Sequence, residues 1–224
     1  MNFDFLKVYY PLYIEGTITT LTVSFFTVTL GTLIGITLAI MKLSKNDLLK
    51  FVASSYIEIV RGTPLIVQAL LLFALITLPD FYIGNSFNLA RAIPGILALS
   101  INSSAYIAEI IRAGILAVDK GQREAGESLG MNNFDIMKYI IMPQAIKNIL
   151  PAIGNEFVVL IKESSILYIV GIQELMAKTD TIRASTYRPL EPLIVTSIIY
   201  FCITFSISKI IGNFERKLQK DARN

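Results

Sequence analysis

The chain has 224 residues, of which 54% are hydrophobic and 17% are charged, and its mean hydropathy is +0.60. This composition excludes an ordinary water-soluble domain of that length and indicates several membrane-spanning helices. A net charge of +3 does not favour nucleic-acid binding, and one cysteine (Cys202) without any histidine leaves no internal disulfide and few metal ligands or general bases.

Five apolar stretches approach or exceed the length that crosses a bilayer. In chain order they cover residues 12–41, 48–78, 89–117, 150–172 and 193–211. We therefore predict an all-α membrane protein with five transmembrane helices, formed by one domain over residues 12–212. A short segment at 1–11 precedes this domain, and a tail at 213–224 follows it.

Lysine and arginine are distributed unevenly among the connecting segments. They are most frequent after the first apolar stretch, in the central loop at about 119–143, and in the tail. The positive-inside rule places these segments in the cytoplasm. The segment 1–11 is then extracytoplasmic and the tail 213–224 is cytoplasmic, which agrees with an odd number of spans.

Glycine and proline predict how the first two helices pack and bend. Gly31 and Gly35 stand four residues apart in the first stretch, and small residues at that spacing allow close helix contact. Gly62 and Pro64 interrupt the second stretch, because proline removes a backbone hydrogen bond and glycine is flexible. We expect either an ordinary proline kink or an opening whose freed backbone groups line a cavity.

Charged residues inside the predicted spans need partners, because a charge near the bilayer centre is costly. Glu58 and Arg61 lie three residues apart, so they can meet on one helix face. Glu109 and Arg112 have the same spacing. We predict an ion pair at each of these two places, toward the cytoplasmic ends of their helices.

A second polar group lies near the middle of the predicted bilayer. Lys162 and Asn102 fall near the midpoints of their stretches, and Glu156 lies about 9 Å from Lys162 toward the cytoplasm. Lys162 and Asn102 could bind the carboxylate of a zwitterion, while Glu156 binds its ammonium group or a cationic side chain. The alternative is that Lys162 pairs with Glu156 or Glu163 in a network that only holds helices together.

The central loop is polar but does not look like a slack linker. Residues 122–129 are good helix formers, and Gly130 suits a left-handed helix end. A short charged helix at this place predicts either a rigid protrusion that a cytoplasmic partner binds or an amphipathic helix that lies on the bilayer surface.

This loop resembles the cytoplasmic EAA loop of ATP-binding-cassette importer permeases. The pattern of that family is E-A-A, three residues, G, nine residues and then I-x-L-P. Glu124, Ala125, Gly126 and Gly130 occupy the first positions here, and Ile-Ile-Met-Pro follows at 140–143. The spacing is kept, while glycine replaces the second alanine and methionine replaces the leucine. The resemblance implies that the four named residues shape a surface coupled to an ATPase.

Three further segments resemble the histidine, glutamine and arginine subgroup of these permeases. They are Arg-Gly-Thr-Pro at 61–64, Asn-Ser-Ser-Ala-Tyr at 102–106 and Gly-Asn-Glu-Phe at 154–157. The resemblance extends over residues 16–212 and implies a type I importer fold. The substrate pocket of the family, carried over to this chain, corresponds to Asn102, Glu156, Lys162, Thr63, Pro64 and Leu65.

The same resemblance implies an importer of a polar amino acid in the cytoplasmic membrane of a prokaryote. The expected partners are a second permease subunit, identical or a close paralogue, two ATP-binding-cassette ATPase subunits and an extracytoplasmic amino acid-binding protein. No run matches the phosphate-binding motif G-x-x-x-x-G-K-[ST]. ATP and Mg²⁺ are therefore expected on the ATPase subunits, and this chain is expected to be a transport subunit that binds no cofactor and is not an enzyme.

A rival interpretation is an ion-coupled secondary transporter that uses the buried acids as proton or sodium sites. We find no inverted repeat in the chain, and five spans do not divide into equal halves. Uptake that follows an ion gradient while ATP is held constant would favour this alternative.

Overall fold

A computed structural model gives the structure of the chain and describes residues 2–83 and 87–220, the last two without their side chains. The described part is almost entirely helical. In chain order the elements are α1 (Leu6–Leu43), α2 (Asp47–Gly62), α3 (Leu65–Leu75), β1 (Tyr82–Ile83), β2 (Phe87–Asn88), α4 (Leu89–Leu116), α5 (Lys120–Ser128), α6 (Asn133–Asp135), the π-helical turn η1 (Ile136–Ile141), α7 (Met142–Glu163), the 3₁₀ helix η2 (Ser164–Val170), α8 (Leu175–Thr186) and α9 (Glu191–Lys220). The two short strands pair antiparallel.

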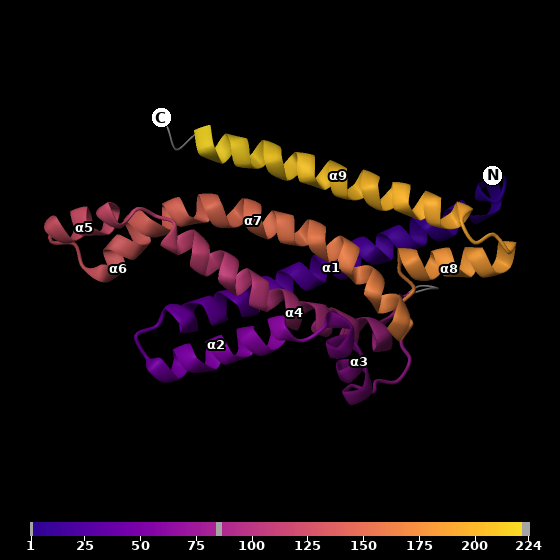
Figure 1. Cartoon of the computed structure of the whole chain (residues 1–224), viewed down its shortest axis with the longest axis horizontal. Helices are drawn as coiled ribbons and strands as arrows, with labels where there is room; N and C mark the ends of the chain where they lie inside the picture. The colour runs from indigo at the N-terminus through magenta and orange to yellow at the C-terminus, as the bar shows by residue number, and fades with distance from the viewer. Residues whose placement is uncertain (1, 84–86, 221–224) are drawn as a thin grey trace.

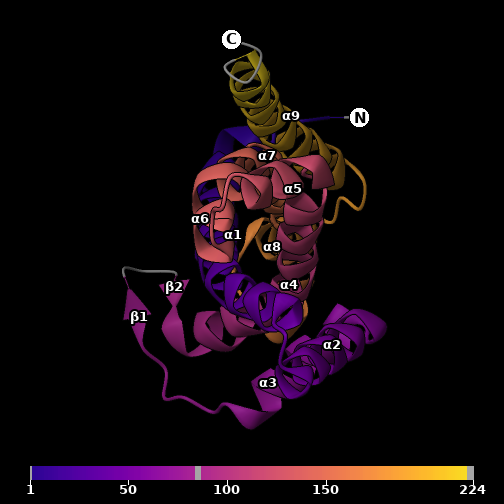
Figure 2. The same cartoon turned by 90° about the vertical axis from the view of Figure 1, so that its left-hand side faces the viewer.

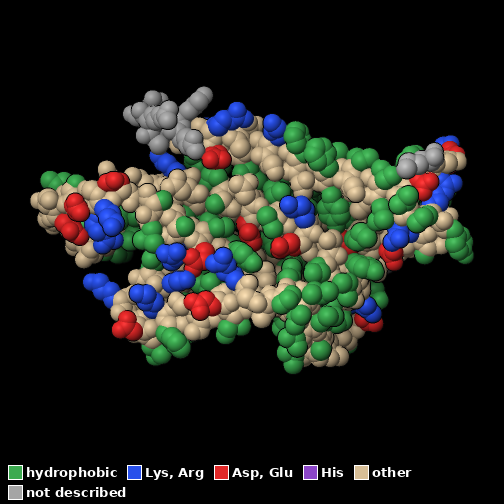
Figure 3. Space-filling model, viewed as in Figure 1, with side chains coloured by type: hydrophobic (Ala, Val, Ile, Leu, Met, Phe, Trp, Pro, Cys, Tyr) green, Lys and Arg blue, Asp and Glu red, His purple; other side chains and the backbone are tan. Residues whose placement is uncertain are grey.

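The long helices run roughly along the long axis of the molecule (Figure 1). One end carries α5, α6, the turn between α1 and α2 and the last turns of α9, and we call it the α5 end. The opposite end carries the N-terminus and α8. Figure 2 shows the hairpin and α3 on the side of the molecule away from α9. In Figure 3 charged side chains gather at the α5 end, while hydrophobic side chains cover α3 and part of α9.

The centre of the fold is the contact between α1 and α4, which pack together over much of their length. Gly31 of α1 lies against the backbone of Ser100 and the side chain of Ser103 on α4. Gly35, one turn further along, lies against Ile107. The predicted close helix contact is therefore confirmed, and it joins two helices of the same chain.

Two glycines of α1 should respond in opposite ways to substitution by alanine. A Cβ at Gly16 would lie 2.8 Å from Cα of Leu175, and this backbone atom cannot move without shifting α8. We therefore expect Gly16→Ala to destabilise the fold by about 1–3 kcal/mol. A Cβ at Gly31 would meet its nearest neighbours at 3.4 Å, which is an ordinary contact. Gly31→Ala should be neutral or should stabilise by up to about 1 kcal/mol through helix propensity.

Thermal unfolding of the two purified variants in one detergent is the measurement for these glycines. The wild-type chain gives the reference temperature. Equal unfolding temperatures of the two variants would contradict the close approach of α1 to α8 at Gly16.

The predicted second span is not one straight helix. The chain bends by 105° between α2 and α3. Among the described residues, three helices are long and apolar enough to cross a membrane: α1, α4 and the part of α9 from Glu191 to Leu218. The bent pair α2–α3 makes a fourth if the two helices count as one broken span, and the five-span count stays a prediction.

The boundaries of the other predicted segments also shift. The predicted fourth span is helical from α7 through η2, but α7 starts at Met142, before the predicted residue 150. The first helix starts at Leu6, so about half of the predicted N-terminal segment is helical. At the other end, α9 continues to Lys220 and takes in most of the predicted tail. Cys202 lies exposed on α9.

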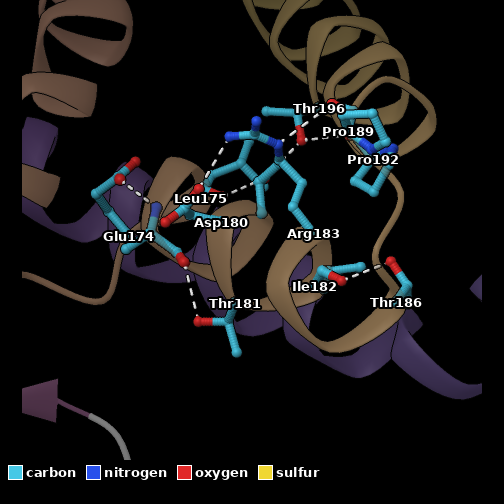
Figure 4. A network of polar contacts seen from close by, with 12 residues as sticks. Glu174, Leu175, Asp180, Thr181, Ile182, Arg183, Thr186, Pro189, Pro192 and Thr196 are labelled. Carbon is cyan, nitrogen blue, oxygen red and sulfur yellow. Dashed lines mark hydrogen bonds and ion pairs between the residues drawn. The ribbon is translucent and has the colours of Figure 1, made fainter.

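The position of α8 depends on a buried carboxylate at its start. Glu174 is fully buried, and its side chain accepts hydrogen bonds of 2.8 Å from the backbone N–H groups of Met176 and Ala177. The hydroxyl of Tyr200 on α9 also donates to it, at 3.1 Å. Figure 4 shows this cap together with Arg183, which points toward Asp180 and the carbonyl of Pro189. These contacts fix α8 against α9.

Stability should depend on pH through Glu174. Burial raises the pKa of Glu174 from 4.5 to about 7, against the opposing effect of its hydrogen-bond donors. Between these values the folded chain keeps a proton that the unfolded chain releases, so the free energy of unfolding falls as pH rises from about 4.5 to 7. We expect a loss of about 2–3 kcal/mol across this window. Unfolding temperatures measured from pH 5 to 8 should fall in the wild type and fall less in Glu174→Gln, and parallel curves would exclude Glu174 as the titrating group.

Candidate functional site

The break between α2 and α3 frees backbone carbonyl groups that side chains then satisfy. Pro64 has no N–H, so the carbonyl of Val60 loses the helical partner that residue 64 would supply. The side-chain amide Nε2 of Gln68 donates to this carbonyl at 2.8 Å. The hydroxyl of Thr63 donates to the carbonyl of Ile59 at 2.9 Å. The break is therefore a hydrogen-bonded structure rather than a simple proline kink.

Two consecutive residues of α4 connect this break to α7. Asn102 is buried, with 5% of its surface exposed, and its Nδ2 donates to Oε1 of Gln68 at 3.0 Å. Ser103 is also buried, and its hydroxyl donates to Oε1 of Glu156 on α7 at 2.9 Å. We call Thr63, Gln68, Asn102, Ser103 and Glu156 the polar cluster. It joins three helices through side chains that can bind a polar ligand.

The structure brings only some of the sequence-predicted site residues together. Thr63 and Asn102 both contact Gln68, and Pro64 makes the break beside them. Leu65 is partly buried and packs against the apolar core formed by α1, α3, α4 and η2. Lys162 lies exposed on α7, six residues beyond Glu156.

Lys162 makes no ion pair within the part of the chain that the structure describes. No hydrogen bond or ion pair joins it to Asn102, Glu156 or Glu163. The alternative in which Lys162 closes a network that holds helices together is therefore not seen.

The two ion pairs predicted toward the cytoplasm have different outcomes. Glu109 pairs with Arg112 at 3.0 Å, as predicted, and it also pairs with Lys42 of α1 at 2.5 Å. Glu58 and Arg61 form no ion pair with each other among the described residues, so that prediction was wrong. The guanidinium of Arg61 lies instead over the ring of Tyr106, 5.2 Å from its centre. Stacking on an aromatic face replaces the salt bridge.

The central loop contains the helix that its sequence predicts. Asp119 caps α5 by accepting a hydrogen bond of 2.7 Å from the backbone N–H of Gly121. At the other end Gly130 has a φ of +77°, in the left-handed region. The N–H of Gly130 donates to the carbonyl of Glu127, and the N–H of Met131 donates to that of Gly126. These two bonds form a Schellman motif, which ends the helix sharply.

Packing explains why glycine stands where the family pattern has alanine. Gly126 is buried, and a Cβ there would lie 2.9 Å from Ile136 and 3.1 Å from Ile140, both in η1. The helix α5 therefore lies directly on η1. A groove of about 400 Å³ separates α5 from the end of α4, and it is lined by Ile115, Leu116, Val118, Asp119, Lys120, Arg123, Glu124, Glu127 and Ile141. A compact helix beside an open groove at one end of the molecule suits docking of another protein.

Sequence reasoning missed two members of the polar cluster, Gln68 and Ser103. A signal for Gln68 was present, because it is the one polar residue in the apolar sequence of α3 and it follows Pro64 by four positions. Ser103 lies among several small polar residues of α4, and no feature of the sequence distinguishes it from them. Its role depends on which residue of α7 it faces.

Comparison with known proteins places this geometry in a family. The family described as "Binding-protein-dependent transport system inner membrane component" matches residues 31–220. The putative glutamine transport system permease protein GlnP of Rickettsia conorii is 42% identical over 220 residues, which cover 96% of this chain and 98% of that protein. The arginine transport system permease protein ArtQ of Bacillus subtilis is 38% identical over 223 residues, which cover 99% of this chain and all of that protein.

Solved structures agree with this assignment. The chain superimposes on a crystal structure of an amino acid ABC transporter with histidines with a TM-score of 0.87 and 49% identity, covering 97% of this chain and 100% of that chain. The inward-facing MetNI methionine ABC transporter has the same fold, with a TM-score of 0.77 at 16% identity and coverage of 97% and 99%. The chain therefore belongs to the family of binding-protein-dependent transport system inner membrane components.

Proposed function

We propose that this chain is the permease subunit of an ATP-driven importer of a polar amino acid. The polar cluster carries this proposal, because consecutive residues of α4 hydrogen-bond to an amide on α3 and to a carboxylate on α7. Relatives named as glutamine and arginine transport permeases support a polar amino acid as the substrate. Asn102, Glu156 and Lys162, with the break at Thr63, Pro64 and Leu65, form the proposed substrate site.

The proposed topology has five spans, with the N-terminus outside and the C-terminus in the cytoplasm. The spans are α1, the bent pair α2–α3, α4, α7 with η2, and α9. The α5 end is then cytoplasmic, and the lysines at 42, 45 and 50 and those of the tail support this choice through the positive-inside rule. The α8 end faces outward, where a binding protein would dock.

Coupling to ATP hydrolysis is proposed to act through α5. One of the two ATPase subunits would dock on the α5 of this chain, where Glu124, Ala125 and Gly130 are exposed, while the buried Gly126 seats α5 on η1. Closure of the ATPase subunits on ATP would move α5 as a rigid lever, because the cap at Asp119 and the Schellman motif hold both of its ends. Binding of ATP and binding of substrate would then both shift the same equilibrium between two conformations of the chain. This is the condition for coupling. A second permease subunit completes the proposed assembly.

The test is reconstitution of the chain in liposomes with candidate ATPase subunits, a candidate binding protein and each of the common amino acids in turn. Stimulation of ATP hydrolysis and uptake by one group of polar amino acids is the expected result, and that group defines the substrate class. An ionophore added at constant ATP serves as the control. Uptake that requires an ion gradient, without any associated ATPase, would overturn the proposal.

A further inference from the structure

Gln68 occupies an unusual place for a polar side chain. The rest of α3 is apolar, and Gln68 lies one turn after Pro64, with its side chain directed back over the break. Its Nε2 lies 2.8 Å from the carbonyl oxygen of Val60, 3.2 Å from that of Thr63 and 2.8 Å from the hydroxyl of Thr63. Three oxygens therefore surround one end of the amide.

These contacts fix which way the amide of Gln68 points. A backbone carbonyl oxygen can only accept a hydrogen bond, so the group that faces Val60 and Thr63 must be the NH₂ of Gln68. Its Oε1 then points away from the break and toward α4. A reversed amide would place Oε1 against two carbonyl oxygens and would leave the carbonyl of the buried residue Val60 without a donor, which is costly.

The orientation of Gln68 in turn fixes the orientation of Asn102. Because Oε1 of Gln68 only accepts, the atom of Asn102 that lies 3.0 Å from it must be Nδ2. The other side-chain atom, Oδ1, receives no hydrogen bond within residues 2–83 and 87–220. The next residue of α4, Ser103, donates a hydrogen bond to one oxygen of Glu156. Asn102 therefore offers an oxygen, rather than an amide nitrogen alone, to a ligand at the polar cluster.

We propose that Gln68 is a positioning residue of the substrate site, which sets the amide of Asn102 so that Oδ1 is presented as a hydrogen-bond acceptor. This inference rests on the proposed function, because it assumes that the polar cluster binds an amino acid. Through Gln68, the break between α2 and α3 and the proposed ligand site form one hydrogen-bonded unit. A change in the bend between α2 and α3 moves Gln68 and thereby reorients Asn102.

A double-mutant cycle on ligand affinity tests this role. The variants are Gln68→Met, which has a similar length but no donor and only a weak acceptor, Asn102→Ala, and the two combined, each in the assembled transporter in lipid nanodiscs. The probes are radiolabelled L-glutamine and L-arginine. Each single variant should raise Kd about tenfold, and the double variant should stay within about threefold of Asn102→Ala, because residues that act as a unit are not additive.

Controls separate this inference from the function on which it rests. Leu71→Met, on the exposed face of the same helix, should leave Kd unchanged. Gln68→Leu, which also lacks the donor and the acceptor of the amide, replaces Gln68→Met in the same cycle if Gln68→Met does not assemble. If the wild type binds and the Kd increase of the double variant equals the product of the two single increases, the positioning role of Gln68 is overturned. The proposed function then still stands. A wild type that binds neither amino acid nor any other polar amino acid would overturn the proposed function and this inference with it.

Discussion

Replacing Glu156 by glutamine is expected to weaken substrate binding about hundredfold. Glu156 is half-buried on α7, and among the described residues its carboxylate has a hydrogen bond from Ser103 but no cationic partner. A carboxylate left without a cation in an apolar region is costly unless a ligand supplies the positive charge. Glutamine keeps the shape and the bond to Ser103 but removes the charge, so the effect should fall on ligand affinity.

The matched control for this prediction is Ser103→Ala. That variant keeps the charge of Glu156 and removes only one neutral-to-charged hydrogen bond, so it should raise Kd by about tenfold or less. Equilibrium binding of labelled amino acid to the assembled transporter gives both values. Wild-type affinity in Glu156→Gln would show that the carboxylate does not touch the ligand.

Gly130→Val is expected to abolish substrate-stimulated ATP hydrolysis and uptake while the chain stays in the membrane at normal abundance. No atom lies within 4 Å of a Cβ at this position, so crowding is not the reason. The reason is the φ of +77°, which costs a β-branched residue about 1–3 kcal/mol. The chain can relieve that strain by opening the Schellman motif, and α5 then loses the fixed end that a lever requires.

Two controls isolate the backbone angle at Gly130. Gly212→Val adds the same side chain in equally open space within a regular helix, and it should leave uptake within about twofold of wild type because helix propensity changes little there. Gly130→Asn should retain most activity, since asparagine tolerates the left-handed region. The measurement is ATP-driven uptake normalised to the amount of chain in the membrane. Normal uptake in Gly130→Val would mean that α5 does not transmit the movement.

The sequence predicted those parts of the site that depend on local rules. Gly130 marked the end of α5, because few residues other than glycine adopt a left-handed helix end. Pro64 marked the break in the second span, because a proline always removes a helical hydrogen bond. Counting residues along two apolar stretches placed Asn102 and Lys162 near the middle of the bilayer and Glu156 about 9 Å closer to the cytoplasm.

The remaining parts of the site depend on contacts between helices, and residue spacing does not encode them. Arg61 had an acid three residues away, yet it stacks on Tyr106 of another helix. Gln68 meets Asn102 only because the chain turns by 105° after Gly62. A proline predicts that a helix is interrupted, but the size of the bend is set by the packing of both halves.

The single cysteine gives this chain a ready attachment point for a probe. Cys202 is exposed on α9, close to the middle of that long apolar helix. A thiol-reactive label can therefore be attached without first removing other cysteines, and the wild-type sequence itself serves as the labelled protein. Because the neighbours of Cys202 on α9 are apolar, an uncharged, lipid-permeant maleimide should reach it in membranes much faster than a charged one. The ratio of the two labelling rates would show whether lipid or water surrounds this face of α9.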